Sequence, residues 1–194
     1  MRSISVILST TLDGVVQAPG RGDEDTQNGF DLGGWGNGYG DDVMAREMGK
    51  GMDRPGDMLF GRRTWEDFAA VWGPQTDGNP YTEHMNAATK YVVSTTLDNA
   101  DAWPNSVLLR GSAVETVAEL KAVPGKDLAI IGSVSLVRAL HAAGLVDSYT
   151  FLIHPLTLGR GARLFEGPAP LTEFSLASSV ATTTGVLIAQ YERR

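Results

Sequence analysis

Short apolar runs alternate with helical patterns along most of this chain. A continuous apolar run of a few residues between turn signals is typical of a strand that is buried on both faces. Runs of this kind predict strands at residues 4–8, 58–60, 91–94, 107–109 and 128–131. Because predicted helices separate these strands, we expect the strands to form a mainly parallel sheet.

Helical spacing of apolar side chains marks the intervening segments. A short amphipathic helix is predicted by methionines four residues apart, which are Met44, Met48 and Met52. A second helix has one apolar face, made by Trp65, Phe68, Ala69 and Trp72. Two pairs that resemble capping boxes, Thr64 with Asp67 and Ser112 with Glu115, predict helix starts. A further helix is expected over residues 133–143.

The pattern changes towards the end of the chain. Apolar runs at 149–153, 174–180 and 186–191 predict three further strands, the last two joined around Thr184 and Gly185. Such a pair reads as an antiparallel hairpin, so the sheet is expected to be mixed. No internal repeat or low-complexity linker divides the sequence, and we therefore expect a single α/β domain over residues 1–194.

Composition narrows the classes of function. A net charge of −7 without a basic stripe argues against nucleic acid or a membrane surface as a partner. The absence of cysteine excludes disulfides, Cys-ligated zinc, iron–sulfur clusters and thiol nucleophiles. His84, His141 and His154 lack metal-ligand spacing, so we expect no metal site, with His141 on a helix surface and His154 at a strand end. The amino end is too short in its apolar part to span a membrane, and a cytoplasmic protein is expected.

Small, polar and cationic residues follow three of the predicted parallel strands. They form the sets Gly61-Arg62-Arg63-Thr64, Ser94-Thr95-Thr96 and Gly132-Ser133, and Arg110 follows a fourth strand. Ligands bind beyond the carboxyl ends of parallel strands, where helix N-termini attract phosphate and arginine adds bidentate recognition. Each set alone is also compatible with a surface cation, a polar strand end or a tight turn. Together they favour a ligand with more than one phosphate.

The order of these motifs resembles the dihydrofolate reductase-like superfamily, in the branch of the reductase domain of bacterial riboflavin biosynthesis. The resemblance rests on Thr-Leu-Asp-Gly at 11–14, Leu-Phe-Gly-Arg-Arg-Thr-Trp-Glu at 59–66, Val-Val-Ser-Thr at 92–95, Ile-Ile-Gly-Ser at 130–133 and the run at 144–165. It covers nearly the whole chain. It implies a three-layer α/β/α fold, with a mixed, mostly parallel central sheet and a C-terminal antiparallel hairpin, that binds NADPH.

The resemblance also implies which residues contact the cofactor. By analogy, the pyrophosphate and the adenosine 2′-phosphate are met by Gly61, Arg62, Arg63 and Thr64. The 2′-phosphoribose and adenine side is lined by Ser94, Thr95 and Arg110. The pyrophosphate is wrapped by Gly132, Ser133 and Val134, where the family often has glycine at the position of Val134. The nicotinamide is bordered by Ser9, Val15 and Val16.

The substrate side lies in the long, polar, glycine-rich segment before residue 42, and loops of this length are often functional. Hydride acceptors also need a proton, and the candidate catalytic carboxylates are Asp41 and Asp13. We interpret Asp42 as the cap of the following helix, and a turn-forming role is the alternative for Asp13. Trp35 and Tyr39 either stack on a flat heterocyclic substrate or pack into the core and hold the loop.

The sequence therefore predicts a NADPH-dependent oxidoreductase that acts on a small pyrimidine- or pterin-like molecule. The best named activity is that of a 5-amino-6-(5-phosphoribosylamino)uracil reductase in riboflavin biosynthesis, although only Arg21 offers a cation for a substrate phosphate in the loop. Dihydrofolate reduction is the second hypothesis, and a non-catalytic NADP(H)-binding protein is the third. Without cysteine the chain cannot build the zinc site of a fused deaminase, so we expect a stand-alone reductase domain. A homodimer formed through residues 155–165 is a further expectation.

Overall fold

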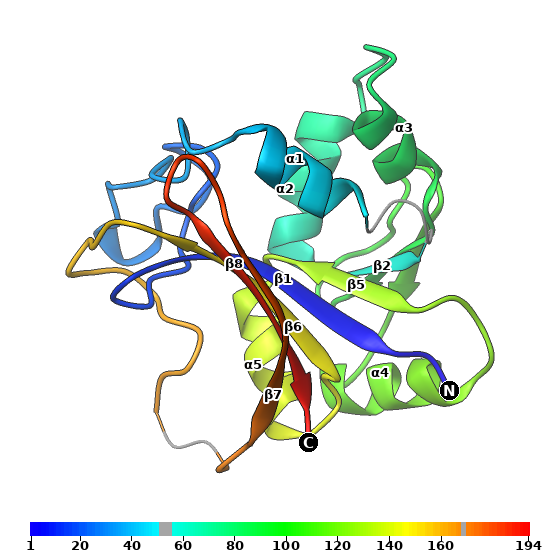
Figure 1. Ribbon diagram of the computed structural model, residues 1–194. Coiled ribbons are helices and arrows are strands. Elements are labelled where there is room, and N and C mark those ends of the chain that lie inside the picture. The colour runs from blue at the N-terminus through cyan, green and yellow to red at the C-terminus, as the bar shows by residue number, and fades with distance from the viewer. Residues whose placement is uncertain (51–55, 168–169) are drawn as a thin grey trace. The chain divides into compact units, whose positions relative to one another are not determined.

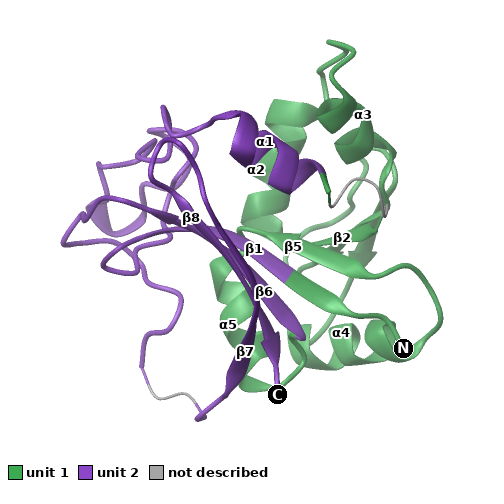
Figure 2. Ribbon diagram, viewed as in Figure 1, with its two compact units in different colours: residues 1–5, 50–146 green, residues 6–49, 147–194 purple. Residues whose placement is uncertain are grey.

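The computed structural model describes residues 1–50, 56–167 and 170–194 (Figure 1). The chain divides into two compact units, shown in Figure 2. Unit 1 comprises Met1–Ser5 and Lys50–Val146, and unit 2 comprises Val6–Gly49 and Asp147–Arg194. Strand β1 (Ile4–Thr11) begins in unit 1 and continues in unit 2. A single domain over residues 1–194 stays a prediction.

Four parallel strands form the sheet of unit 1. They are β2 (Asp57–Gly61), β3 (Lys90–Val93), β4 (Ser106–Leu109) and β5 (Leu128–Ile131), in the order β4-β3-β2-β5. The register pairs Gly61 with Val93 and Val93 with Leu109, so three strands end level with one another. The polar residues that follow these strands therefore share one edge of the sheet, as the sequence predicted.

Helices cover both faces of these strands. Figure 1 shows α2 (Arg62–Trp72) and α3 (Pro80–Ala87) on one face and α4 (Ala113–Ala122) and α5 (Val134–Ala142) on the other. The three-layer α/β expectation is thereby confirmed. An aromatic core beneath α2 joins Phe60, Trp65 and Trp103, all at most 2% exposed. Helix α3 escaped the sequence prediction, although Asn79 followed by Pro80 is a readable start signal and Asn79 does accept the N–H of Tyr81.

The helix start predicted at Ser112 is confirmed, whereas the one predicted at Thr64 is wrong. Helix α2 begins three residues earlier than the Thr64 box implies, after Gly61, and the Thr64 hydroxyl instead accepts a hydrogen bond from the N–H of Ser133. Ser112 does precede α4, but within the described chain its hydroxyl makes no capping bond, and its carbonyl accepts from both the N–H and the hydroxyl of Thr116. The prediction that His141 lies on a helix surface is also wrong, because that residue is buried on α5.

Unit 2 carries the antiparallel part of the fold. Its strands follow the order β1-β6-β8-β7, where β6 is Ser148–His154, β7 is Phe174–Ala181 and β8 is Leu187–Arg193. Strand β8 pairs antiparallel with both β6 and β7, which confirms the predicted hairpin and the mixed α/β class. At the hairpin turn the hydroxyl of Thr182 accepts the N–H of Val186.

Unit 2 also includes the segment from the end of β1 to the end of α1 (Asp42–Gly49), which contains a 3₁₀ turn at Gln27–Gly29. Met44 and Met48 of α1 pack against a buried cluster of Leu152, Val186 and Ile188, whereas Met52 lies outside the described residues. Over the described part of the chain, no helix has both the length and the apolar character needed to cross a membrane.

Candidate functional site

Two hydrogen bonds tie the first turn of α2 to the turn that starts α5. The N–H of Ser133 donates to the Thr64 hydroxyl at 3.1 Å, and the N–H of Gly61 donates to the Ser133 hydroxyl at 3.0 Å. Gly132 and Ser133 both have left-handed backbone angles, with φ of 67° and 50°. A Cβ on Gly132 would lie 3.2 Å from the methyl group of Thr64, so glycine permits this close approach. We call Gly61, Thr64, Gly132 and Ser133 the anion frame.

Helix geometry leaves backbone donors at this frame. The first intrahelical bond of α5 runs from the N–H of Val137 to the carbonyl of Ser133. The N–H groups of residues 134–136 therefore have no carbonyl within their own helix, and the same holds for residues 62–64 of α2. Both helix starts also carry partial positive charge. The arrangement suits an anion with several oxygens, such as a pyrophosphate.

The structure brings together the residues predicted at this edge. Some of them bond to one another and shape the site, whereas others have donors left for a ligand. The N–H and hydroxyl of Ser133 are occupied within the frame, so they build the site rather than offer donors to a ligand. The first backbone N–H of α5 that can donate to a ligand is therefore that of Val134. The sequence could not separate these tasks, because the bonds join residues 69 and 72 positions apart.

The two arginines open α2. Arg62 forms an ion pair with Glu66 one turn later, with N–O distances of 2.8 and 3.0 Å, and both side chains are more than a third exposed. Arg63 is exposed at the second position of the helix. An exposed ion pair of this kind contributes only about 0–1 kcal/mol, so a phosphate can replace Glu66 as the partner of Arg62.

A second polar group follows β3 and β4. The Ser94 hydroxyl is buried and accepts the N–H groups of Thr96 and Leu97, so this side chain forms the turn. Thr95 and Thr96 are exposed on the same turn, and Arg110 donates to the carbonyl of Asp98 at 2.5 Å. Thr95, Thr96 and Arg110 therefore offer the accessible groups here, whereas Ser94 shapes their backbone. Thr96 was visible in the sequence but was not among the predicted contacts.

Asp13, in unit 2, anchors the loop that follows β6. Its carboxylate accepts from the Thr11 hydroxyl at 2.6 Å and from the N–H groups of Leu158 and Gly159 at 3.2 and 2.8 Å. Arg163 also donates to the carbonyl of Asp13 at 2.7 Å. The Thr11 hydroxyl, followed by these backbone donors, lowers the pKa of Asp13 to about 2 against the opposing effect of burial. Asp13 is therefore ionised at neutral pH and poorly suited to donate a proton.

Asp41, not Asp42, caps α1, which corrects the sequence interpretation. One carboxylate oxygen of Asp41 accepts the N–H of Met44 at 2.7 Å, and the other accepts the N–H and hydroxyl of Thr183 at 2.6 and 2.5 Å. The reason is positional, because the residue before the first helical residue can reach the third N–H. The hydrogen bond from the Thr183 hydroxyl is the largest cause of a lowered pKa of Asp41.

Trp35 and Tyr39 pack on His154 rather than projecting together from the glycine-rich loop. Both rings meet the imidazole edge-on, with centroids 5.2 Å away. Trp35 is buried, and its indole N–H donates to the carbonyl of Gln17 at 2.7 Å, so it holds the loop on the core. Tyr39 is half-buried, and its carbonyl accepts the hydroxyl of Thr184. Burial lowers the pKa of His154, whose aromatic contacts no sequence pattern had indicated.

The residues predicted to border the nicotinamide lie along β1 and the bend after it. Val15 and Val16 are buried, and the N–H of Val16 donates to the carbonyl of Ala162 at 2.9 Å. Ser9 is half-buried within β1. Gly161, opposite this bend, has a φ of 115°, and a Cβ there would lie 2.7 Å from Val15 and 2.8 Å from Phe30. The valine side chains therefore belong to the packing of unit 2.

Comparison with known proteins gives a consistent set of relatives. The uncharacterized protein YyaP of Bacillus subtilis (strain 168) is 29% identical over 137 residues, which is 67% of this chain and 70% of that protein. A putative riboflavin biosynthesis protein from Shewanella sp. PV-4 has a solved structure that matches with a TM-score of 0.70, at 18% identity and 99% coverage of both chains.

A pyrimidine reductase-like protein from Corynebacterium diphtheriae matches with a TM-score of 0.66, at 13% identity, over 100% of this chain and 92% of that one. At these identities the two structures support the fold alone. The model of the RibD C-terminal domain matches residues 2–188, nearly the whole chain. This protein belongs to the RibD C-terminal domain family, the branch that the sequence resemblance indicated.

Proposed function

We propose that this protein is a NADPH-dependent reductase of a pyrimidine- or pterin-like heterocycle. The observation that carries the proposal is the anion frame, where two helix starts are joined at the carboxyl ends of parallel strands. Two arginines are the first two residues of one of these helices, α2. Family membership supports an oxidoreductase of the riboflavin-biosynthesis type. Within that class we favour 5-amino-6-(5-phosphoribosylamino)uracil as the substrate, because the chain belongs to the RibD C-terminal domain family.

The groups of unit 1 fit the phosphates of the cofactor. The backbone donors at 62–64 and 134–136 would hold the pyrophosphate, and Arg62 and Arg63 would contact both the pyrophosphate and the 2′-phosphate. Thr95, Thr96 and Arg110 would hold the 2′-phosphate, which distinguishes NADPH from NADH. When bound, the nicotinamide supplies the hydride, and the protein's part is to orient donor and acceptor and to exclude water.

The groups of unit 2 suit a different part of the reaction. Asp13 and Asp41 remain the proposed catalytic carboxylates, but their lowered pKa values favour orienting a water molecule or a substrate N–H over donating a proton. We therefore assign the final proton to a water held by one of them. Tyr39 is the proposed aromatic contact of the substrate, because Trp35 is already committed to the core.

The proposal is tested in two steps. Titration with NADPH and NADH, followed by nicotinamide fluorescence, should show micromolar binding with preference for NADPH. Failure of both cofactors to bind would end the reductase proposal. If NADPH binds, turnover is measured with the phosphoribosylaminopyrimidine and with dihydrofolate. Activity on the first alone is expected, activity on dihydrofolate alone would replace the substrate, and binding without turnover would leave a non-catalytic NADP(H)-binding protein.

A further inference from the structure

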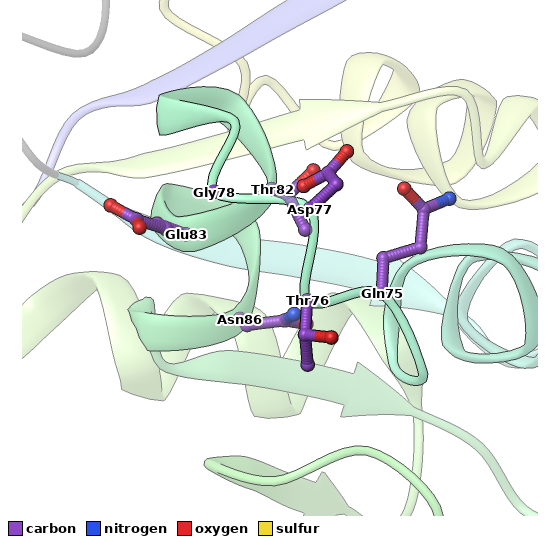
Figure 3. A pocket seen from close by; sticks show the side chains of 7 residues that line it. All are labelled: Gln75, Thr76, Asp77, Gly78, Thr82, Glu83 and Asn86. Atoms are coloured by element: carbon purple, nitrogen blue, oxygen red, sulfur yellow. The ribbon is translucent and has the colours of Figure 1, made fainter.

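A hollow lies in unit 1 between the segment after α2 and the first turns of α3, but its charged side chains do not converge (Figure 3). The carboxylates of Asp77 and Glu83 point away from each other there, and both residues are exposed. In unit 2, by contrast, two aromatic rings converge on one buried polar side chain that the proposed reaction does not use. That side chain is the imidazole of His154.

The imidazole of His154 is held in a fixed plane. This residue ends β6 and is only 2% exposed. Its Nδ1 atom lies 2.9 Å from the carbonyl oxygen of Leu152, and because a carbonyl oxygen can only accept, Nδ1 carries the ring proton and donates it. This hydrogen bond limits rotation of the ring, so the neighbouring side chains meet an imidazole of defined orientation.

Tyr39 depends on that imidazole for its own orientation. It stands between Gly38 and Gly40, which have no side chains and lie in open space, since a Cβ added at either would meet no atom within 4 Å. Its carbonyl accepts the hydroxyl of Thr184 at 2.6 Å, which fixes the backbone. Its ring packs against the same buried cluster as α1 and meets the ring of His154 edge-on, with centroids 5.2 Å apart. The imidazole is therefore one of two supports of the Tyr39 ring.

Trp35, the second ring on His154, has further supports. Its indole N–H donates to the carbonyl of Gln17 at 2.7 Å, and its ring belongs to a separate buried cluster with Val15 and Phe30. Loss of the imidazole would therefore leave Trp35 anchored, whereas the half-buried Tyr39 would lose one side of its support. The difference points to Tyr39 as the residue through which His154 acts.

We propose that His154 is a positioning residue for the substrate, and that its imidazole holds the Tyr39 ring in the orientation that contacts the flat heterocycle. The inference rests on the proposed function, in which Tyr39 is the aromatic contact of the substrate. A ring that is already held in place loses little freedom when the substrate binds, which favours affinity. His154 is too buried to contact the substrate itself, so it acts on substrate binding and not on hydride transfer.

Steady-state kinetics with the phosphoribosylaminopyrimidine test this role. His154→Ala should raise KM about three- to tenfold, the effect of losing one edge-to-face aromatic pair, and should leave kcat within about twofold. An unchanged Kd for NADPH would show that the variant is folded. His154→Phe should restore most of the affinity, because a ring again supports Tyr39. His84→Ala, which replaces a half-buried histidine of α3, is the control and should leave KM unchanged.

A double-mutant cycle separates action through Tyr39 from general loosening of unit 2. Tyr39→Ala alone should raise KM at least as much as His154→Ala does. In the Tyr39→Ala background, the further change His154→Ala should have almost no effect on KM, because the ring that it positions is already absent. Additive effects of the two changes, or a kcat that falls while KM stays constant, would overturn the proposal.

Hydrogen exchange gives a readout that does not depend on activity. In His154→Ala the amides of residues 36–41 should exchange faster, because this part of the loop has lost one support, whereas α2 should exchange as in the unaltered protein. Absence of turnover in the unaltered protein would end the proposed function, and the substrate role of His154 with it, whatever the exchange shows. Normal turnover with unchanged exchange in His154→Ala, or faster exchange with an unchanged KM, would overturn this proposal and leave the proposed function standing.

Discussion

At the starts of α2 and α5 in unit 1, helix geometry leaves backbone N–H groups without intrahelical partners, and arginines stand beside them. Around Asp13 and Asp41 in unit 2, the protein itself supplies donors to the carboxylate oxygens. The first region is built with capacity left for a ligand, whereas the second uses its polar groups to hold loops. Changes in the first region should therefore affect cofactor binding, and changes in the second should affect stability as well as turnover.

The largest expected effect is on cofactor binding. Replacing Arg62 and Arg63 together by alanine removes two charge-assisted contacts worth roughly 1.5–3 kcal/mol each, so the Kd for NADPH should rise about 100-fold or more. Fluorescence titration measures this rise. The loss for NADH should be much smaller, and equal losses would contradict contact of these arginines with the 2′-phosphate. Lys126→Ala, an exposed cation before β5, serves as the control.

The next largest effect tests whether the close packing around Gly161 stabilises unit 2. Gly161→Ala should destabilise the protein by about 2–4 kcal/mol, because a Cβ would overlap Val15 and Phe30 at a left-handed backbone position. Gly159→Ala is the matched control, since Gly159 has a φ of 74° and no atom within 4 Å of an added Cβ. Urea unfolding should give a loss of only about 1 kcal/mol for that control. Equal losses would show that backbone strain, not the contact with Val15 and Phe30, limits the site.

Asp13→Asn tests the carboxylate that anchors the loop. The variant should be about 1–3 kcal/mol less stable at pH 7, because its amide cannot accept the N–H of Gly159 as the carboxylate does. The pKa of Asp13 falls from 3.8 to about 2 on folding, so its stabilising effect is present above pH 3.8 and disappears as the pH falls towards 2. Urea unfolding at several pH values should show the two proteins converging in acid. A constant difference would assign the effect to shape rather than charge.

The comparison also explains what the sequence could predict. The strands and most helices followed from apolar periodicity, and the phosphate edge followed from rules that hold for every parallel sheet: strand ends meet at one edge, and helix starts present donors. Side-chain partners did not follow. The bond of Thr64 to Ser133 joins residues 69 positions apart, so local capping rules assigned Thr64 to the wrong partner. The cap of α1 was placed at Asp42 because carboxylates stand at both 41 and 42 and the sequence pattern does not fix the first helical residue.

His154 gives a smaller effect with its own dependence on pH. Burial lowers the pKa of its imidazole in the folded protein, so the unfolded chain binds a proton more readily and stability should fall as the pH drops below about 6.5. His154→Phe keeps an aromatic ring between Trp35 and Tyr39 but cannot titrate. Its unfolding free energy should change less between pH 7 and pH 5 than that of the unaltered protein. An identical pH dependence would place the titrating group elsewhere.

The smallest expected effect concerns the ion pair of Arg62 and Glu66 beside the anion frame, which competes with a phosphate for Arg62. Glu66 holds Arg62 in a two-bonded ion pair, and a phosphate must displace this carboxylate or share the arginine with it. Because an exposed pair is worth about 0–1 kcal/mol, Glu66→Gln should tighten NADPH binding by a few-fold at most and leave stability almost unchanged. The gain should shrink at high salt, since added ions screen the charge of Glu66 in the unaltered protein. Weaker NADPH binding in the variant would contradict this expectation. It would mean that Glu66 holds Arg62 in the position from which it contacts the phosphate.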